Sequence, residues 1–202
     1  NAEDLGRCRS FLRSIREQFQ VHVFAVEYPG YGLCPGGPCN AELAQQAVFA
    51  GFRFLCEVLR FPLDSVLVFG RSIGCGPALA LASRYEVSGL ILVSPMTSFR
   101  ELCQDLVGPL AAIVEERFPN RALMAQVRSS VLIVHGLKDK VVACRHGLEL
   151  FRACQSRKLF VCPPDLSHNA NLLTNVSYLV LPMLQFFALP DYCFEDVVVP
   201  SW

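Results

Sequence analysis

The pentapeptide Gly70-Arg71-Ser72-Ile73-Gly74 has the form G-x-S-x-G and directly follows an unbroken apolar run, Val66–Phe69. It precedes a helix-like segment that includes Pro77. In this setting the two glycines allow a strand to turn sharply into a helix, which places the serine hydroxyl beyond the carboxyl end of the strand. We therefore predict that Ser72 is a nucleophile. The alternative is a glycine-rich turn whose serine has no chemical role.

Five short apolar runs recur along the chain and are predicted to be strands. They are unbroken rather than alternating, which is typical of strands buried on both faces of a sheet. The runs are His22–Val26, Val66–Phe69, Leu90–Val93, Val131–Val134 and Leu159–Cys162.

Helix-like segments separate these runs. Asn40 is expected to cap a helix that continues to Arg60, and Pro182 is expected to open a last helix that ends at Phe187. The alternation of strands and helices predicts an α/β fold with a mostly parallel sheet and helices on both of its faces. The other predicted helices are Asp4–Phe19, Ser72–Arg84 and Arg145–Cys154.

We expect one domain over residues 1–188 and a C-terminal extension over residues 189–202. The interval 99–128 is longer than a single crossover requires and has a helical apolar pattern of its own, so it is interpreted as a small cap insertion. Its apolar positions either line a groove for an acyl chain or pack on the sheet, and the pattern leaves both open. These positions are Leu102, Leu106, Val107, Leu110, Ile113 and Val114.

The composition limits the class of protein. With 18 basic and 18 acidic residues the formal net charge is zero, so nothing indicates nucleic-acid binding. The ten cysteines are scattered without a C-x-x-C pair, and no His or Cys residues are grouped at metal-ligand spacing. We therefore predict free thiols in a reducing, cytoplasmic compartment, with no metal and no cofactor. No apolar run reaches the roughly 18–20 residues of a membrane span.

A serine nucleophile needs a base, and the base needs an acid that orients it. Each partner is expected after a later strand, in the order Ser, Asp, His. Asp139 follows the run Val131–Val134, and His168 follows the run Leu159–Cys162. We therefore predict a catalytic triad in which Ser72 is the nucleophile, His168 the general base and Asp139 the orienting acid.

The competing residues fit this order less well. His22 lies at the start of a predicted strand, His135 ends one, and His146 falls within a predicted helix. Asp165 is too close to His168 in sequence for a strand and a helix to lie between them. None of these alternatives replaces the predicted triad.

An oxyanion on the substrate must be met by fixed N–H donors. One is predicted to be the backbone N–H of Ile73, at the start of the helix that follows the nucleophile. The second normally comes from the loop after an earlier strand, and the first residues of this sequence, Asn1 or Ala2, are the candidates.

Several motifs together resemble the α/β-hydrolase domain-containing protein 17 group. The match runs in the correct order from about Asn1 to Phe187. It is carried by Asn1-Ala2-Glu3-Asp4-Leu5-Gly6, Tyr28-Pro29-Gly30-Tyr31-Gly32, Gly70-Arg71-Ser72-Ile73-Gly74, Ala82-Ser83-Arg84-Tyr85-Glu86, Ser94-Pro95-Met96-Thr97-Ser98, His135-Gly136-Leu137-Lys138-Asp139 and Ser167-His168-Asn169.

The resemblance implies an α/β-hydrolase fold and a serine hydrolase. It further implies cleavage of thioesters in S-palmitoylated proteins at the cytosolic face of membranes, with peripheral membrane association. The alternatives are a generic carboxylesterase or peptidase-like hydrolase acting on a small acyl ester or thioester, and a non-catalytic scaffold of the same fold. The sequence departs from the family pattern at Ser167, where the family has glycine, and its leading strands are expected to be missing.

Overall fold

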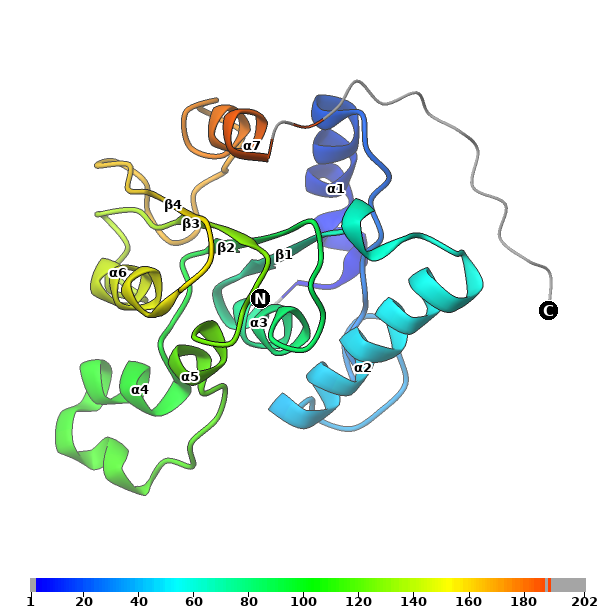
Figure 1. Ribbon diagram of the computed structural model, residues 1–202. Helices are drawn as coiled ribbons and strands as arrows, with labels where there is room; N and C mark the ends of the chain where they lie inside the picture. The colour runs from blue at the N-terminus through cyan, green and yellow to red at the C-terminus, as the bar shows by residue number, and fades with distance from the viewer. Residues whose placement is uncertain (1–2, 188, 190–202) are drawn as a thin grey trace.

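The computed structural model describes residues 3–187 and 189, and it contains one four-stranded sheet. All strands are parallel, and neighbours in sequence are neighbours in the sheet, in the order β1-β2-β3-β4 (Figure 1). The strands are β1 (Leu67–Arg71), β2 (Gly89–Val93), β3 (Ser130–Val134) and β4 (Lys158–Val161). A parallel sheet of this kind confirms the predicted fold class.

Helices cover both faces of the sheet. In Figure 1, α1 and α7 lie on one side, whereas α3, α5 and α6 lie on the other. The helices are α1 (Leu5–Phe19), α2 (Ala41–Arg53), α3 (Cys75–Ala82), α4 (Phe99–Val107), α5 (Asn120–Met124), α6 (Cys144–Ala153) and α7 (Val180–Phe187).

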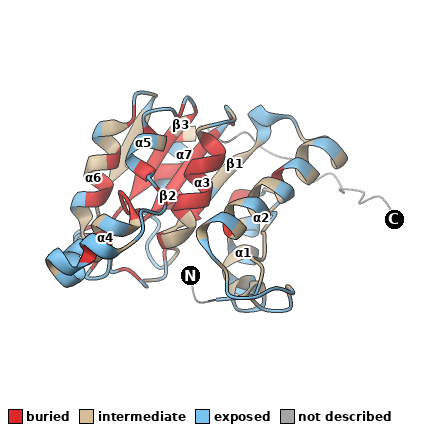
Figure 2. Ribbon diagram, turned by 90° about the horizontal axis from the view of Figure 1, so that it is seen from below, coloured by how far each residue is buried: buried red, intermediate tan, exposed pale blue. Residues whose placement is uncertain are grey.

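Side chains of the central strands alternate between two core layers, one on each face of the sheet. Ile91 and Val93 of β2 pack in the layer that includes α1 and α7, whereas Leu90 and Leu92 pack in the layer of α3, α5 and α6. Successive side chains of a strand point to opposite faces, so a strand covered on both sides must be apolar at every position. Every residue of β2 is buried, which accounts for its unbroken apolar sequence (Figure 2).

The predicted strand His22–Val26 is wrong. Residues 21–28 are extended but pair with no strand among the described residues. The side chains instead lie against the region after α2, where the Phe24 and Phe54 rings are 6.1 Å apart and the His22 and Phe61 rings 6.2 Å apart. An apolar run forms a strand only when another backbone lies at hydrogen-bonding distance, and none of the described strands offers one here.

The helix ends differ slightly from prediction. Asn40 caps α2 as predicted, since its side chain accepts a hydrogen bond from Leu43 N at 2.8 Å. The α-helix ends at Arg53 and continues as a π-helical turn to Val58, short of the predicted Arg60. Pro182 is the third residue of α7 rather than its first. This position lies in the first turn, where an N–H group has no acceptor within the helix, so proline loses no hydrogen bond there.

The interval 99–128 contains α4, a 3-10 segment (Gly108–Ile113) and α5. Leu102 of α4 is buried and Val114 is half-buried, but the four other apolar side chains of the predicted pattern face solvent rather than the sheet. The exposed fractions are 62% for Leu106, 53% for Val107, 73% for Leu110 and 92% for Ile113. Packing on the sheet, one of the two alternatives for this pattern, is therefore wrong for these four residues, which we call the α4 apolar surface.

The division at residue 188 stays a prediction, since only Leu189 of the extension lies within the described residues. Among the helices of residues 3–187, none is both long and apolar enough to cross a membrane.

Candidate active site

The strand β1 turns into α3 through Ser72, whose φ of +53° lies in the left-handed region. A non-glycine residue rarely adopts this conformation, and such strain is concentrated at functional sites. The turn needs Gly70, because a Cβ there would lie 2.7 Å from Gly74 O and 2.8 Å from Cys75 Cα. Gly74 has no such restriction, since its nearest neighbour would be Tyr28 Oη at 3.8 Å. The first glycine therefore permits the sharp turn.

The structure brings the three predicted triad residues together from distant parts of the chain. The Ser72 Oγ lies 3.0 Å from His168 Nε2, although 96 residues separate them. The His168 Nδ1 lies 2.8 Å from Asp139 Oδ2. Ser72 lies beyond β1, Asp139 beyond β3 and His168 beyond β4, all at the carboxyl edge of the sheet. The arrangement has the hydrogen-bonding geometry of a nucleophile, a base and an orienting acid.

Both carboxylate oxygens of Asp139 have hydrogen-bond partners. Its Oδ1 accepts hydrogen bonds from Val141 N at 2.9 Å and Val142 N at 2.8 Å, while Oδ2 faces His168. Burial by itself raises the pKa of this carboxyl, but hydrogen bonds from His135, His168, Val142 N and Ser94 outweigh it and hold the pKa well below its usual range. Asp139 is therefore an anion that is fixed in position.

His135 is a second histidine beside Asp139, which its place at the end of a strand does not predict. Its ring is fully buried, and Nε2 lies 2.9 Å from Val142 O and 3.5 Å from Asp139 Oδ2. The same nitrogen therefore faces both the Val142 carbonyl, which is the nearer acceptor, and the Asp139 carboxylate. Its Nδ1 has no hydrogen-bond partner within the described part of the chain and lies against Gly147, where a Cβ would be 2.5 Å away.

Arg71 occupies a variable position of the G-x-S-x-G motif, so the motif does not predict a role for it. Its Nη2 donates to His168 O at 2.7 Å and to Ala170 O at 2.8 Å. Burial lowers the pKa of Arg71, although Glu3 and Asp139 partly oppose this. A guanidinium remains charged at any physiological pH. Arg71 thus fastens the backbone of His168 to the turn that carries Ser72.

The predicted oxyanion donors fall into two groups. Ile73 lies in the first turn of the helical segment after Ser72, where backbone N–H groups have no acceptor within the helix. Its N–H is therefore free to face a substrate oxygen, and that role stays a prediction. Asn1 and Ala2 lie outside the described residues.

The competing residues are occupied elsewhere. His146 is fully buried, with Nδ1 2.7 Å from Thr97 Oγ1 and Nε2 2.9 Å from Asp105 Oδ2. Asp165 accepts a hydrogen bond from Tyr178 Oη at 2.6 Å. The structure therefore places neither residue in the cluster around Ser72.

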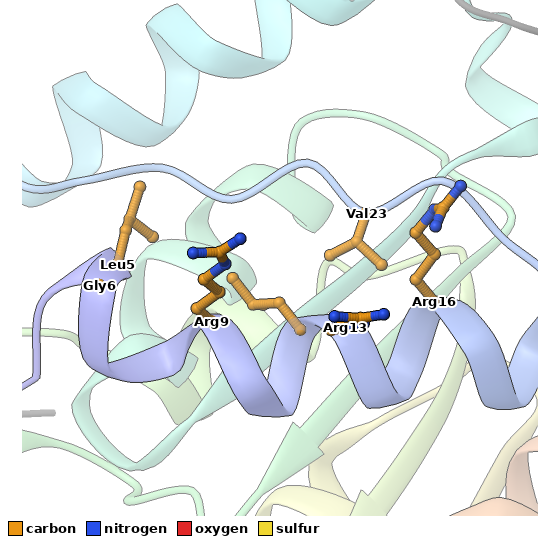
Figure 3. Close-up of a pocket in the computed structure, with 7 residues that line it drawn as sticks. Leu5, Gly6, Arg9, Arg13, Arg16 and Val23 are labelled. Atoms are coloured by element: carbon orange, nitrogen blue, oxygen red, sulfur yellow. The ribbon is translucent and has the colours of Figure 1, made fainter.

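A cavity of about 610 Å³ lies between α1 and the extended segment 21–28 (Figure 3). Three arginines of α1 and several apolar side chains line it, but no triad residue does. The lining residues are Leu5, Gly6, Arg9, Leu12, Arg13, Arg16 and Val23. Among residues 3–187 and 189, no group of three or more His, Cys, Asp or Glu side chains is arranged to hold a metal ion.

Comparison with known proteins shows which proteins this chain is similar to. No protein-family model matches the chain. Human alpha/beta hydrolase domain-containing protein 17B is 34% identical over 157 residues, which cover 77% of this chain and 53% of the relative. Alpha/beta hydrolase domain-containing protein aho-3 of Caenorhabditis elegans is 30% identical over 169 residues, covering 84% and 50%. The chain thus spans about half the length of the curated relatives it matches.

A solved structure agrees with the sequence matches. Monoacylglycerol lipase of Paleococcus ferrophilus superposes with a TM-score of 0.62 at 15% identity, covering 85% of this chain and 83% of the lipase. At this identity the likeness shows the fold alone. The chain is an α/β-hydrolase-fold protein. Its sequence is similar to the α/β-hydrolase domain-containing protein 17 group, as the motifs predicted.

Proposed function

We propose that this protein is a serine hydrolase that cleaves acyl thioesters or esters through an acyl-enzyme on Ser72, with S-palmitoylated proteins as the favoured substrates. The observation that carries the proposal is the chain of two hydrogen bonds from Ser72 through His168 to Asp139. A cysteine thioester would enter the reaction as the acyl donor, and the protein thiol would be the leaving group.

In the first half of the reaction, Ser72 Oγ attacks the carbonyl carbon while His168 Nε2 takes its proton. Asp139 holds the His168 Nδ1–H and stabilises the imidazolium that forms. The developing oxyanion faces the Ile73 N–H. When the tetrahedral intermediate collapses, the carbon–sulfur bond breaks and His168 returns the proton to the departing thiolate.

In the second half, a water molecule replaces the thiol. His168 removes a proton from the water as it attacks the acyl carbon, and then returns that proton to Ser72 Oγ as the fatty acid leaves. Each proton that His168 accepts is given back within the same half-reaction. Arg71 supports both halves, because it fixes the backbone carbonyl of His168.

The preference for a long acyl chain is supported by the surroundings of the turn. Ile73 packs against the buried cluster of Met96, Leu102 and Val142, and Leu102 belongs to α4. The α4 apolar surface continues from that helix and is open to solvent. An exposed apolar surface that continues from a helix in contact with Ile73 fits a hydrocarbon ligand or a lipid surface. We therefore include peripheral membrane association in the proposal.

The test compares acetyl, octanoyl and palmitoyl thioesters of one soluble thiol. Burial of three or four CH₂ groups, at about 0.8 kcal/mol each, corresponds to roughly 100-fold in kcat/KM. We expect at least that increase from acetyl to palmitoyl. The double variant Leu110→Ser/Ile113→Ser should lose most of the increase while hydrolysing the acetyl thioester at the wild-type rate.

Leu184→Ser is the matched control, because Leu184 is 41% exposed and lies on α7, well separated from α4 in Figure 1. It should leave the whole series unchanged. Equal kcat/KM for the three chains would contradict the acyl specificity and make a generic carboxylesterase the better description. No turnover of any ester or thioester by well-folded protein would favour a non-catalytic scaffold.

A further inference from the structure

Two cysteines meet at the carboxyl edge of the sheet. Cys144 is the first residue of α6, and Cys162 directly follows β4. Their Sγ atoms are 3.2 Å apart, and both residues are half-buried. A disulfide has an S–S distance of about 2.05 Å, so the two sulfurs need to approach by only roughly 1 Å to bond.

The two thiols lie on the segments that carry Asp139 and His168. Asp139 precedes Cys144 in one segment, and His168 follows Cys162 in the other. The two segments are already in contact, since Leu137 N donates to Pro163 O at 3.0 Å and Lys138 N donates to Leu166 O at 3.2 Å. A bond between the sulfurs would join segments that already touch, so it requires no rearrangement of the fold.

We propose that Cys144 and Cys162 form a reversible disulfide when a low-molecular-weight disulfide such as oxidised glutathione oxidises them. The bond would clamp the segment that contains Asp139 and Cys144 to the segment that contains Cys162 and His168. The inference concerns the thiols alone and does not depend on the hydrolase activity.

Oxidised glutathione is the oxidant in this exchange and accepts the two electrons that the thiols lose. The thiolate of one cysteine attacks a glutathione sulfur, the glutathione S–S bond breaks, and one glutathione thiolate leaves and takes up the proton that the cysteine lost. The thiolate of the second cysteine then attacks the protein sulfur of the mixed disulfide and releases the second glutathione, which takes up the second proton. Two protein thiols are oxidised, and one glutathione disulfide is reduced to two thiols.

Burial slows this reaction without preventing it. Burial first, and then the hydrogen bond with the Cys162 sulfur, raise the pKa of Cys144 to about 12. Since the thiolate is the reacting species, attack by Cys144 should be slow at neutral pH and faster at alkaline pH. Cys75 is a contrasting case, because it is fully buried and its thiol faces Val93 O rather than a second sulfur.

The test treats the full chain with oxidised glutathione at mildly alkaline pH, blocks remaining thiols, and identifies disulfide-linked peptides by mass spectrometry without reduction. Trypsin cleaves after Lys140 and Arg145 and releases Cys144 in a short peptide. The peptide that begins at Leu159 holds both Cys162 and Cys193, so the Cys193→Ser variant is the background for the experiment.

We expect a linked Cys144–Cys162 peptide that disappears in Cys144→Ser and in Cys162→Ser but persists in Cys103→Ser, the matched control. The oxidised protein should melt about 5 °C higher than the reduced protein, and reduction should reverse the shift. Recovery of Cys144 and Cys162 as free thiols or as separate glutathione adducts would overturn the disulfide site. A linked peptide without a rise in Tm would overturn the clamp.

Discussion

The guanidinium of Arg71 donates to the backbone carbonyl of His168 at 2.7 Å, across 97 residues of sequence. Arg71 immediately precedes Ser72, so one residue links the position of Ser72 to the position of His168. The same Nη2 atom also holds Ala170 O at 2.8 Å. We therefore expect the distance between Ser72 Oγ and His168 Nε2 to depend on this side chain.

Arg71→Met should lower kcat by about 10- to 100-fold with little change in KM, because a displaced base costs reaction rate rather than ground-state binding. Steady-state kinetics on a short thioester measures both constants, and circular dichroism checks the fold. Arg13→Met, which removes an exposed side chain paired with Glu17, should change neither constant. An Arg71→Met protein with wild-type kcat would show that the link to His168 is dispensable.

Asp139→Asn should reduce kcat by about 10⁴-fold while the protein stays folded, because the amide disturbs the tautomer of His168. Asp165→Asn is the matched control. Asp165 hydrogen-bonds Tyr178 and should be replaceable with little effect on kcat. If Asp165→Asn were crippling and Asp139→Asn silent, Asp165 would be the acid.

Asp139 should also contribute to folding stability at neutral pH. Its folded-state pKa is held below the ordinary value of about 4, despite burial, by the hydrogen bonds from His135, His168 and Val142 N. Since the folded pKa is the lower one, the contribution is complete above about pH 4 and is lost as the pH falls toward the folded value. Urea unfolding should find Asp139→Asn less stable than wild type at neutral pH, with the gap shrinking in acid. A gap that widens in acid would refute this assignment.

Gly147→Ala should destabilise the protein by about 1–3 kcal/mol, although alanine normally favours a helix. The added Cβ would lie 2.5 Å from His135 Nδ1 and displace the ring. Denaturant unfolding of a double-mutant cycle isolates the contact, because most of the cost should disappear in a His135→Ala background, where only the contact with the residue-135 Cβ at 3.1 Å remains. At Gly37 an added methyl group meets nothing within 4 Å, so Gly37→Ala serves as the control. Equal costs of Gly147→Ala in both backgrounds would rule out the contact with His135.

The sequence was most informative where local pattern and covalent order decide the outcome. The strand–turn–helix around Ser72 follows from Gly70 and the apolar residues before it. The positions of Asp139 and His168 follow from the order of the strands. His22–Val26 has the same apolar pattern as the strands, but pairing depends on a neighbouring backbone, which a pattern does not record.

Arg71 and His135 could not be assigned from sequence for a related reason. Their roles come from contacts with His168 O and Val142 O, which exist only once the chain has folded. The exposure of the α4 apolar surface could not be predicted from sequence either, since helical spacing identifies an apolar face but not what covers it. The exposure of Ile113 is a property of the folded arrangement.

The central claim is that Ser72 is the nucleophile, and covalent labelling with a fluorophosphonate tests it most directly. Trypsin cleaves after Arg71 and releases residues 72–84, a peptide that also contains Ser83, so the modified serine must be located by fragmentation. We predict that the phosphonyl group is on Ser72 and that His168→Ala strongly slows its attachment. Label on a different residue, or undiminished labelling of a folded Ser72→Ala variant, would contradict the claim.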